Sequence, residues 1–245
     1  MKSKLNNKSS KLPFVFSNFA ITADGKIAFA NRQFIPFGSE RDHEHMFELR
    51  ATADAVMAGA RTVETPGTTM GPGGKKFQRL RLAHGLSEFN LRVIVTGSGS
   101  INPRADIFQH RFSPIIMLAS GRAPERQLRL LRSLADEVKV FGDKEIDLPA
   151  ALRWLREKWK VKRLLCEGGG EVNGAMFKAG LVDEVHLTLC PLIFGGRDAP
   201  TLADGAGVQR LQQAARLRLV SMKRVETGIF LVYRRESPRK STKNT

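Results

Sequence analysis

A run of three glycines after a short apolar segment is the part of the sequence best suited to chemistry. The text reads Arg163-Leu-Leu-Cys-Glu-Gly-Gly-Gly-Glu-Val-Asn-Gly174, and a helix is expected to begin near Glu171. Glycines let a ligand approach the backbone closely, and the first N–H groups of a helix are unpaired and carry partial positive charge. The pattern predicts a pyrophosphate cradle formed by Gly168, Gly169 and Gly170.

This run matches neither of two common phosphate-binding signatures. Asn173 stands where the third glycine of G-x-G-x-x-G would fall, and no Lys-Ser/Thr pair follows as in a P-loop. A tight packing turn is an equally good interpretation of the glycines alone. Glu167 favours a ligand site, because open α/β sheets bind ligands outside the carboxyl ends of their strands. The alternative for Glu167 is a solvated loop carboxylate.

Strands and helices must position these groups. Residues rich in β-branched and aromatic types predict strands at 14–21, 55–57, 92–96, 115–119, 138–141, 163–166, 184–189, 217–222 and 229–233. Apolar residues at helical spacing predict helices at 40–52, 124–134, 147–159 and 171–180. Pro124 suits a first turn, Asp147 an N-cap and Gly180 a C-cap.

Alternating strands and helices predict an α/β fold with a mostly parallel sheet, and the last two strands predict an antiparallel hairpin at one side. We find no repeat and no interior linker. We therefore expect one domain over residues 12–235, with disordered basic tails at 1–11 and 236–245. Residues 65–74 are rich in Gly, Pro and Thr and predict a long loop of the kind that shapes ligand sites.

Three motifs occur in order between about residue 13 and residue 235. The first is Ala20-Ile-Thr-Ala-Asp-Gly-Lys26, and the second is LRATADAVMAGARTV at residues 49–63. The third is Glu167-Gly-Gly-Gly, continuing through Asp183-Glu184 to Pro191-Leu-Ile-Phe-Gly-Gly196. Together they resemble the reductase domain family of riboflavin biosynthesis (RibD C-terminal, dihydrofolate-reductase-like).

The resemblance implies a three-layer α/β/α fold on a mixed sheet, and a homodimer. It implies that NADPH reduces the ribosyl side chain of 5-amino-6-(5-phosphoribosylamino)uracil, or of its 2,5-diamino-pyrimidinone counterpart, to the ribityl form. The cofactor would supply the hydride, and the protein would supply orientation and a water-poor pocket. A standalone reductase is implied, because the deaminase zinc signature, H-x-E with P-C-x-x-C, does not occur.

The resemblance also assigns site residues one by one. The implied cofactor contacts are Ala20, Gly59, Thr62, Gly168, Gly169, Gly170, Glu171 and Val172. The implied substrate contacts are Arg50, Glu167 and Asp24. The alternatives are a small core residue at Ala20, a helix-surface ion pair at Arg50 and a purely structural turn at Asp24.

Two departures from the family pattern concern the substrate. After Thr62 the family usually continues with an acidic pair, a proline and a basic substrate contact, whereas this chain reads Val63-Glu-Thr-Pro-Gly-Thr-Thr-Met70. The segment Phe34–Ser39 departs as well. A reductase of another pterin-like small molecule is therefore the alternative function. Basic residues that could fill the gap are Lys75, Lys76 and Arg79.

The formal net charge is +16, of which +4 lies in residues 1–11 and +4 in residues 234–245. The remaining charge suits an anionic ligand or an RNA-rich cytoplasm. No apolar run approaches the roughly 20 residues that span a bilayer, and the start lacks the apolar core of a signal peptide. Cys166 and Cys190 predict buried free thiols, which fits a cytoplasmic protein.

Other chemistries find less support in the residues. His43 and His45 point about 200° apart on a helix, so we expect no metal site. His186 lies in an alternating strand and is expected to be structural. Nucleic-acid binding is disfavoured, because the basic residues do not interleave with aromatic ones.

Two roles in the reaction stay open at this point. The proton could come from Asp42, from Glu167 or from a bound water. Arg122, which closely follows Ala119-Ser120-Gly121, is the candidate contact for the 2′-phosphate that distinguishes NADPH from NADH.

Overall fold

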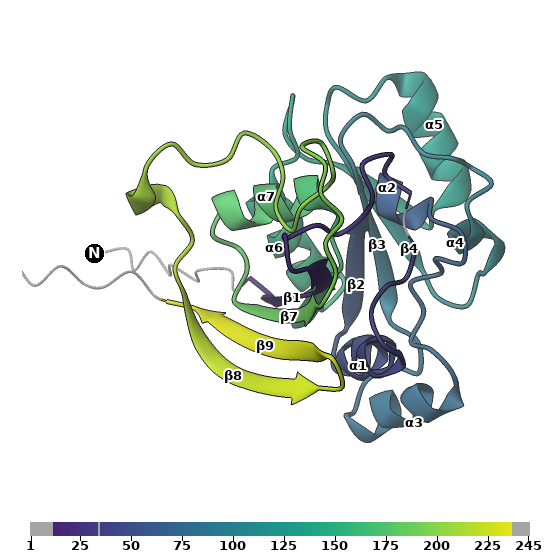
Figure 1. The fold of residues 1–245 in the computed structure, drawn as a ribbon. Helices are drawn as coiled ribbons and strands as arrows, with labels where there is room; N and C mark the ends of the chain where they lie inside the picture. The colour runs from purple at the N-terminus through teal and green to yellow at the C-terminus, as the bar shows by residue number, and fades with distance from the viewer. Residues whose placement is uncertain (1–11, 34, 237–245) are drawn as a thin grey trace, which may run out of the picture.

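A computed structural model describes residues 12–33 and 35–236 (Figure 1). Within them, a nine-stranded sheet has the order β5-β4-β3-β2-β6-β1-β7-β9-β8. The strands are β1 (Phe14–Thr22), β2 (Ala55–Gly59), β3 (Leu91–Thr96), β4 (Ile115–Ala119), β5 (Glu137–Val140), β6 (Arg163–Cys166), β7 (Glu184–Cys190), β8 (Leu217–Val225) and β9 (Gly228–Arg235). Neighbours from β5 to β7 pair in parallel, while β9 pairs antiparallel with β7 and β8. The predicted mostly parallel sheet with a C-terminal hairpin is confirmed.

The helices connect these strands. They are α1 (Glu40–Arg50), α2 (Ala60–Val63), α3 (Lys75–Ala83), α4 (Asp106–Gln109), α5 (Glu125–Leu134), α6 (Leu148–Lys158) and α7 (Gly170–Lys178), with a 3-10 turn η1 (Leu211–Gln213). The four predicted helices are confirmed within about two residues at each end. Asp147 caps α6 by accepting from the N–H of Ala150 at 2.9 Å. Pro124 lies at the N-cap of α5, and Gly180 takes a left-handed φ of 64° just after α7.

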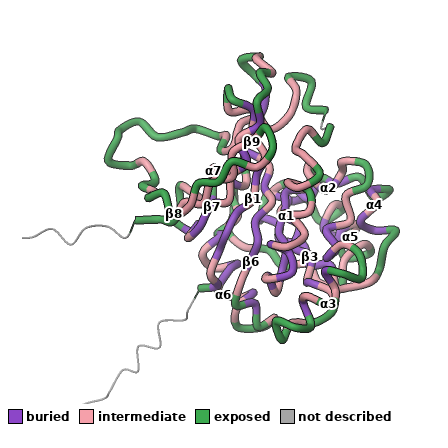
Figure 2. The backbone as a smooth tube through the Cα atoms, turned by 60° about the horizontal axis from the view of Figure 1, so that its bottom comes forward, coloured by how far each residue is buried: buried purple, intermediate pink, exposed green. Residues whose placement is uncertain are grey.

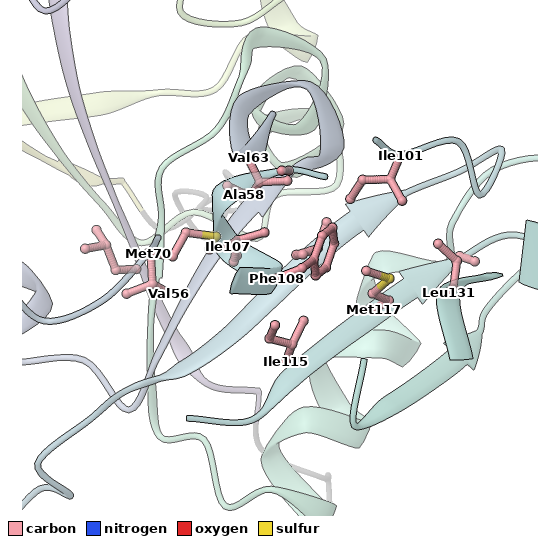
Figure 3. Close-up of a cluster of buried hydrophobic side chains, with 14 of the residues drawn as sticks. Val56, Ala58, Val63, Met70, Ile101, Ile107, Phe108, Ile115, Met117 and Leu131 are labelled. Atoms are coloured by element: carbon pink, nitrogen blue, oxygen red, sulfur yellow. The ribbon is translucent and has the colours of Figure 1, made fainter. Parts of the chain in front are cut away.

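Side chains of successive strand residues alternate between two cores, one on each face of the sheet. On one face, Phe16, Val56 and Ile94 pack with residues of α1, α2, α4 and α5 (Figure 3). On the other face, Val15, Met57 and Val93 pack with residues of α6 and α7. Because both faces of the parallel strands are covered, β2 and β4 are buried at every position. This is the three-layer α/β/α arrangement that the resemblance implied.

The hairpin of β8 and β9 extends the sheet beyond the helical layers (Figures 1 and 2). No position of β8 is fully buried, and Leu219, Val220 and Met222 are exposed, Met222 at 65%. Glu236 continues the chain by donating its N–H to the carbonyl of Arg216 at 2.9 Å. The described chain thus runs one residue past the predicted end of the domain. The remainder of both predicted tails lies outside the described residues.

Cys166 and Cys190 are free and buried, as predicted. Burial raises the pKa of the Cys166 thiol to about 12 and that of the Cys190 thiol to about 11. Both thiols are therefore protonated and unreactive at neutral pH. No helix in the described part of the chain is long and apolar enough to cross a membrane.

Candidate functional site

A cleft of about 1810 Å³ lies where the parallel strands end. It is lined by Ala20 on β1, by Gly59–Thr62 and Thr96–Ser98 at the ends of β2 and β3, by Arg122 after β4 and by the turn after β6. This is the edge at which α/β sheets bind ligands. The volume exceeds the roughly 300–1,000 Å³ typical of one small-molecule site, so the cleft has room for a cofactor and a substrate together.

Two backbone hydrogen bonds join the predicted glycine turn to the end of β2. The N–H of Glu167 donates to the carbonyl of Met57 at 2.8 Å, and the N–H of Gly59 donates to the carbonyl of Gly168 at 2.6 Å. Gly168 has a φ of 82°, and a Cβ there would lie 2.8 Å from the ring of Phe19. A glycine is therefore required at this position.

Thr62 joins two of the predicted cofactor segments. Its hydroxyl oxygen accepts the N–H of Gly169 at 3.0 Å. That N–H is consequently occupied, whereas the hydroxyl proton of Thr62 is available to a ligand. The Thr62 hydroxyl and the start of α7 therefore lie together at this point of the cleft.

The remaining cofactor candidates line the cleft as well. Ala20, Glu171 and Val172 all face it. Glu171 forms an ion pair with Arg61 at 2.7 Å, which offsets its negative charge at this part of the cleft. The side chain of Val172 packs against Gly59, so a Cβ added at Gly59 would lie only 3.0 Å from it. Small residues at 59 and 168–170 therefore let α7 approach β2 closely.

A segment that the sequence reasoning missed covers the start of α7. The N–H of Asp204 donates to the carbonyl of Gly170 at 2.9 Å, and the Asn173 amide donates to the carbonyl of Leu202 at 2.8 Å. A Cβ at Gly174 would overlap the carbonyl oxygen of Asp204. Residues 200–208 also line the cleft, so this segment forms one wall of it. No periodic signal in 200–208 points to such a role.

Arg50 and Glu167 form a two-pronged ion pair at the cleft. Arg50 Nε and Nη2 each lie 2.7 Å from an oxygen of Glu167, and Nη1 donates to the carbonyl of Gly71 at 2.7 Å. The Arg50 and Glu167 side chains are only 9% and 12% exposed. Both predicted residues line the cleft, and the Arg50 alternative of an ion pair on the helix surface is wrong because the pair is buried. The guanidinium N–H groups of Arg50 that could bind a substrate are directed at Glu167 instead, so Arg50 positions this carboxylate.

Asp24 does not line the cleft. Its carboxylate accepts the Thr22 hydroxyl at 2.5 Å and the N–H groups of Phe194 and Gly195 at 3.2 and 2.7 Å. These bonds, that of Thr22 foremost, lower the pKa of Asp24. Asp24 thus ties the turn at 22–26 to the loop at 192–196, which supports the structural alternative over a substrate contact.

The basic residues considered as replacements lie on α3, which the sequence reasoning treated as part of a loop. Lys75, Lys76 and Arg79 do not line the cleft, and Lys76 pairs with Glu44. Arg122 does line it, and its guanidinium lies against Gly97, where a Cβ would come within 2.7 Å of Nη2. Among the described residues, Arg122 has no ion-pair partner.

The histidines have structural contacts. The His186 ring bonds Glu184 at 2.9 Å, and its centroid lies 5.6 Å from that of the tilted His45 ring, a contact that connects β7 to α1. Burial lowers the pKa of His186, although Glu184 opposes this shift. In the described part of the chain, no three His, Cys, Asp or Glu side chains gather in a group that could hold a metal ion.

These features define an α/β/α domain of the dihydrofolate-reductase-like class, with its ligand cleft at the strand ends. The chain belongs to the RibD C-terminal domain family, which matches residues 13–231.

Relatives from two archaea carry the same name, 2,5-diamino-6-ribosylamino-4(3H)-pyrimidinone 5′-phosphate reductase. The protein from Archaeoglobus fulgidus is 31% identical over 222 residues, which cover 91% of this chain and 98% of the relative. The protein from Methanothermobacter thermautotrophicus is 36% identical over 209 residues, covering 84% and 91%. A pyrimidine reductase-like protein from Corynebacterium diphtheriae has a similar fold, with a TM-score of 0.76, 20% identity and 92% of each chain covered.

Proposed function

We propose that this protein is an NADPH-dependent reductase of riboflavin biosynthesis. It reduces the ribosyl side chain of 2,5-diamino-6-ribosylamino-4(3H)-pyrimidinone 5′-phosphate to the ribityl form. The observation that carries the proposal is the cleft itself, in which the Thr62–Gly169 cradle and the buried Arg50–Glu167 pair share one cavity. The names of the two archaeal relatives support the diamino substrate over 5-amino-6-(5-phosphoribosylamino)uracil.

The chemistry divides between cofactor and protein. NADPH would supply a hydride to C1′ of the ribosyl group, and a proton taken up from water would complete the reduction to the ribityl chain. Thr62 and the first turn of α7, which follow β2 and β6, would hold the pyrophosphate of the cofactor. Arg50 keeps the Glu167 carboxylate fixed toward the cleft, where it can accept hydrogen bonds from ribose hydroxyls. A cofactor and a substrate that fill the cleft together would displace water from around the reacting carbon.

The proposal is tested by the absorbance of NADPH at about 340 nm, a wavelength set by the cofactor. Both ribosylamino-pyrimidine phosphates serve as substrates, with dihydrofolate as a control. Oxidation with the diamino compound is the expected result. Oxidation with dihydrofolate alone would replace the riboflavin assignment with a pterin reductase, and no oxidation with any of the three would refute the proposal.

We propose Arg122 as the residue that selects NADPH over NADH. The pyrophosphate cradle lies after β6 and Arg122 after β4, with the ends of β2 and β3 between them. Strands are about 4.8 Å apart, so these points are about 14 Å apart along the sheet edge, which an extended nucleotide and a long arginine side chain can bridge. The guanidinium has no ion-pair partner among the described residues and can contact a phosphate with two N–H groups.

Arg122→Ala is expected to raise the KM for NADPH by about 10–100-fold, the loss of one charge-assisted phosphate contact of roughly 1.5–3 kcal/mol. The KM for NADH should change little, because NADH lacks the 2′-phosphate. Arg126→Ala, an exposed arginine on α5 outside the cleft, is the matched control. An equal rise in the KM for NADPH and for NADH would show that Arg122 does not bind the 2′-phosphate.

We further propose a cytoplasmic homodimer that pairs through the β8–β9 hairpin. The exposed Leu219, Val220 and Met222 lie on β8, the last strand of the sheet. An apolar strand edge of this kind is a site for association. Met222→Asp should shift the mass in sedimentation equilibrium from two chains to one. A wild-type protein that sediments as a monomer at micromolar concentration would refute the dimer.

A further inference from the structure

The wall of the cleft beside Arg50 contains a residue in a strained backbone conformation. Met70 has a φ of 56°, in the left-handed region that residues other than glycine seldom adopt, and only 1% of it is exposed. Its side chain belongs to the hydrophobic cluster that also contains Val56 and Ile107 (Figure 3). Strained residues persist only where the surrounding structure holds them, and they are concentrated at functional sites. The contacts that hold Met70 therefore bear on the cleft.

A buried asparagine holds the carbonyl group of Met70. Asn90 lies just before β3, has 0% of its surface exposed and does not line the cleft. Its Nδ2 donates to the carbonyl of Met70 at 2.9 Å and to the carbonyl of Leu91 at 3.1 Å. Its buried Oδ1 has no hydrogen-bond partner among the described residues, so Asn90 acts only as a donor. Turning the amide over would place Oδ1 against the carbonyl of Met70.

The residues on either side of Met70 are held from behind the wall as well. A Cβ added at Gly71 would lie 2.8 Å from the ring of Phe112, so this ring packs directly on Gly71. The buried guanidinium of Arg92 lies 4.2 Å from the centroid of the same ring, and its Nη1 donates to the carbonyl of Thr69 at 3.5 Å. Among the described side chains, Asn90 alone donates to the carbonyl of Met70.

The next carbonyl along the chain reaches the site. The carbonyl of Gly71 accepts Nη1 of Arg50 at 2.7 Å, while Nε and Nη2 of Arg50 bind Glu167. Because a guanidinium is a rigid plane, the place of Nη1 sets the direction of the other two nitrogens. A short series of buried contacts thus leads from Asn90, through the backbone at Met70 and Gly71, to the carboxylate of Glu167.

We propose that Asn90 is a positioning residue for the reaction, although it lies outside the cleft. By holding the carbonyl of Met70, it directs the carbonyl of Gly71 to Arg50, and Arg50 then keeps the Glu167 carboxylate toward the cleft. The effect on the reaction rests on the proposed function, whereas the orientation of the Arg50 side chain does not.

The first test uses Asn90→Leu, which keeps the branched shape of the side chain and removes both N–H donors. This variant should lower kcat/KM for the diamino pyrimidine phosphate by about 10–100-fold, because displacements of about 1 Å have effects of this size. The dissociation constant for NADPH should keep its wild-type value, because the Thr62–Gly169 contact does not involve Asn90. The control is Leu155→Ala, in the core on the opposite face of the sheet, which should lower stability and change neither constant. An unchanged kcat/KM in Asn90→Leu would overturn the proposal.

A double-mutant cycle with Arg50→Lys shows whether Asn90 acts through Arg50. Lysine has one side-chain nitrogen in place of three, so it can pair with Glu167 but cannot also hold the carbonyl of Gly71 in the same geometry. Asn90→Leu should therefore cause no further loss of kcat/KM in the Arg50→Lys protein. Equal losses in the wild-type and Arg50→Lys proteins would overturn the proposal, since the effects of independent sites add.

Nuclear magnetic resonance reports the orientation of Arg50 without any substrate. The Nε–H of Arg50 is buried against Glu167 and should exchange slowly with water, and Arg50→Lys identifies its signal by removing it. Asn90→Leu should raise this exchange rate by about tenfold or more, because local opening becomes easier. The Nε–H of Arg81, which donates to the carbonyl of Ser87, is the internal control and should keep its rate.

These outcomes separate the role of Asn90 from the proposed function. If the Arg50 signal changes in Asn90→Leu but the wild type reduces neither pyrimidine phosphate, the proposed function fails and the positioning of Arg50 by Asn90 stands. If the Arg50 signal does not change, the positioning fails whatever the substrate is. Asn90→Ala takes the place of Asn90→Leu in every comparison if leucine prevents folding, and the same results are expected of it.

Discussion

Replacing Arg50 with methionine is expected to lower the free energy of unfolding by about 3–5 kcal/mol, and to reduce kcat/KM by at least about 100-fold. The substitution leaves Glu167 as a buried carboxylate that has lost two charge-assisted bonds, and it frees the carbonyl of Gly71. Urea unfolding and the NADPH oxidation assay measure the two effects. The loss of activity follows because Glu167 can no longer be held toward the cleft.

The double variant Arg50→Met with Glu167→Leu separates stability from activity. It should recover most of the lost stability, because a packed apolar pair of similar volume replaces the buried charges. It should stay inactive, because no carboxylate remains to bind the substrate. Arg132→Met is the control, since its pair with Glu125 is more than half exposed and should contribute at most about 1 kcal/mol. An active double variant would show that the pair is purely structural.

Gly174→Ala is expected to weaken NADPH binding about 100-fold, although no side chain that contacts the cofactor is removed. The new methyl group would overlap the carbonyl oxygen of Asp204, and backbone gives way less readily than a side chain. The segment 200–208 would then move away from α7, and shifts of about 1 Å in positioning groups can cost this factor. Isothermal titration with NADPH measures the change, and overpacking should also lower stability by about 1–3 kcal/mol.

The control for this prediction is Gly74→Ala. A Cβ at Gly74 has no neighbour within 4 Å, and Gly74 does not line the cleft. Its N-cap position on α3 should make the alanine less stable by at most about 1 kcal/mol, with an unchanged dissociation constant for NADPH. Equal affinity in Gly174→Ala and in the wild type would mean that the 200–208 wall does not support the cofactor site.

The sequence predicted the parts of this fold whose signals are local. Strand composition identified all nine strands. Parallel strands buried on both faces, such as β2 and β4, are nearly continuous runs of apolar residues, and the exposed hairpin of β8 and β9 was found from its β-branched and aromatic residues around Gly228. The cap at Asp147 and the turn at Gly168 likewise depend on neighbours in the chain. α3 was missed because Lys75–Ala83 is short and directly follows the residues 65–74 that are rich in Gly, Pro and Thr, with no side-chain cap at its N-terminus.

The site was predictable to the extent that it lies at strand ends. Glu167, Thr62 and Arg50 line the cleft as expected. The sequence could not reveal that the guanidinium of Arg50 forms its ion pair with Glu167. Nor could it reveal the wall at 200–208. These features arise from contacts between segments that are distant in sequence, and neither composition nor periodicity reports such contacts.

The central place of β1 in the sheet has a consequence for the order in which the chain folds. β1 pairs with β6 on one side and with β7 on the other, and the N–H of Val15 bonds to Asp183, 168 residues further along. During synthesis, β2, β3, β4 and β5 can pair with one another long before these partners leave the ribosome. The apolar β1 must stay unpaired until then, and non-local pairing of this kind is slow and exposes a chain to aggregation. We therefore expect β1 to be the segment on which chaperones act while this protein is being made.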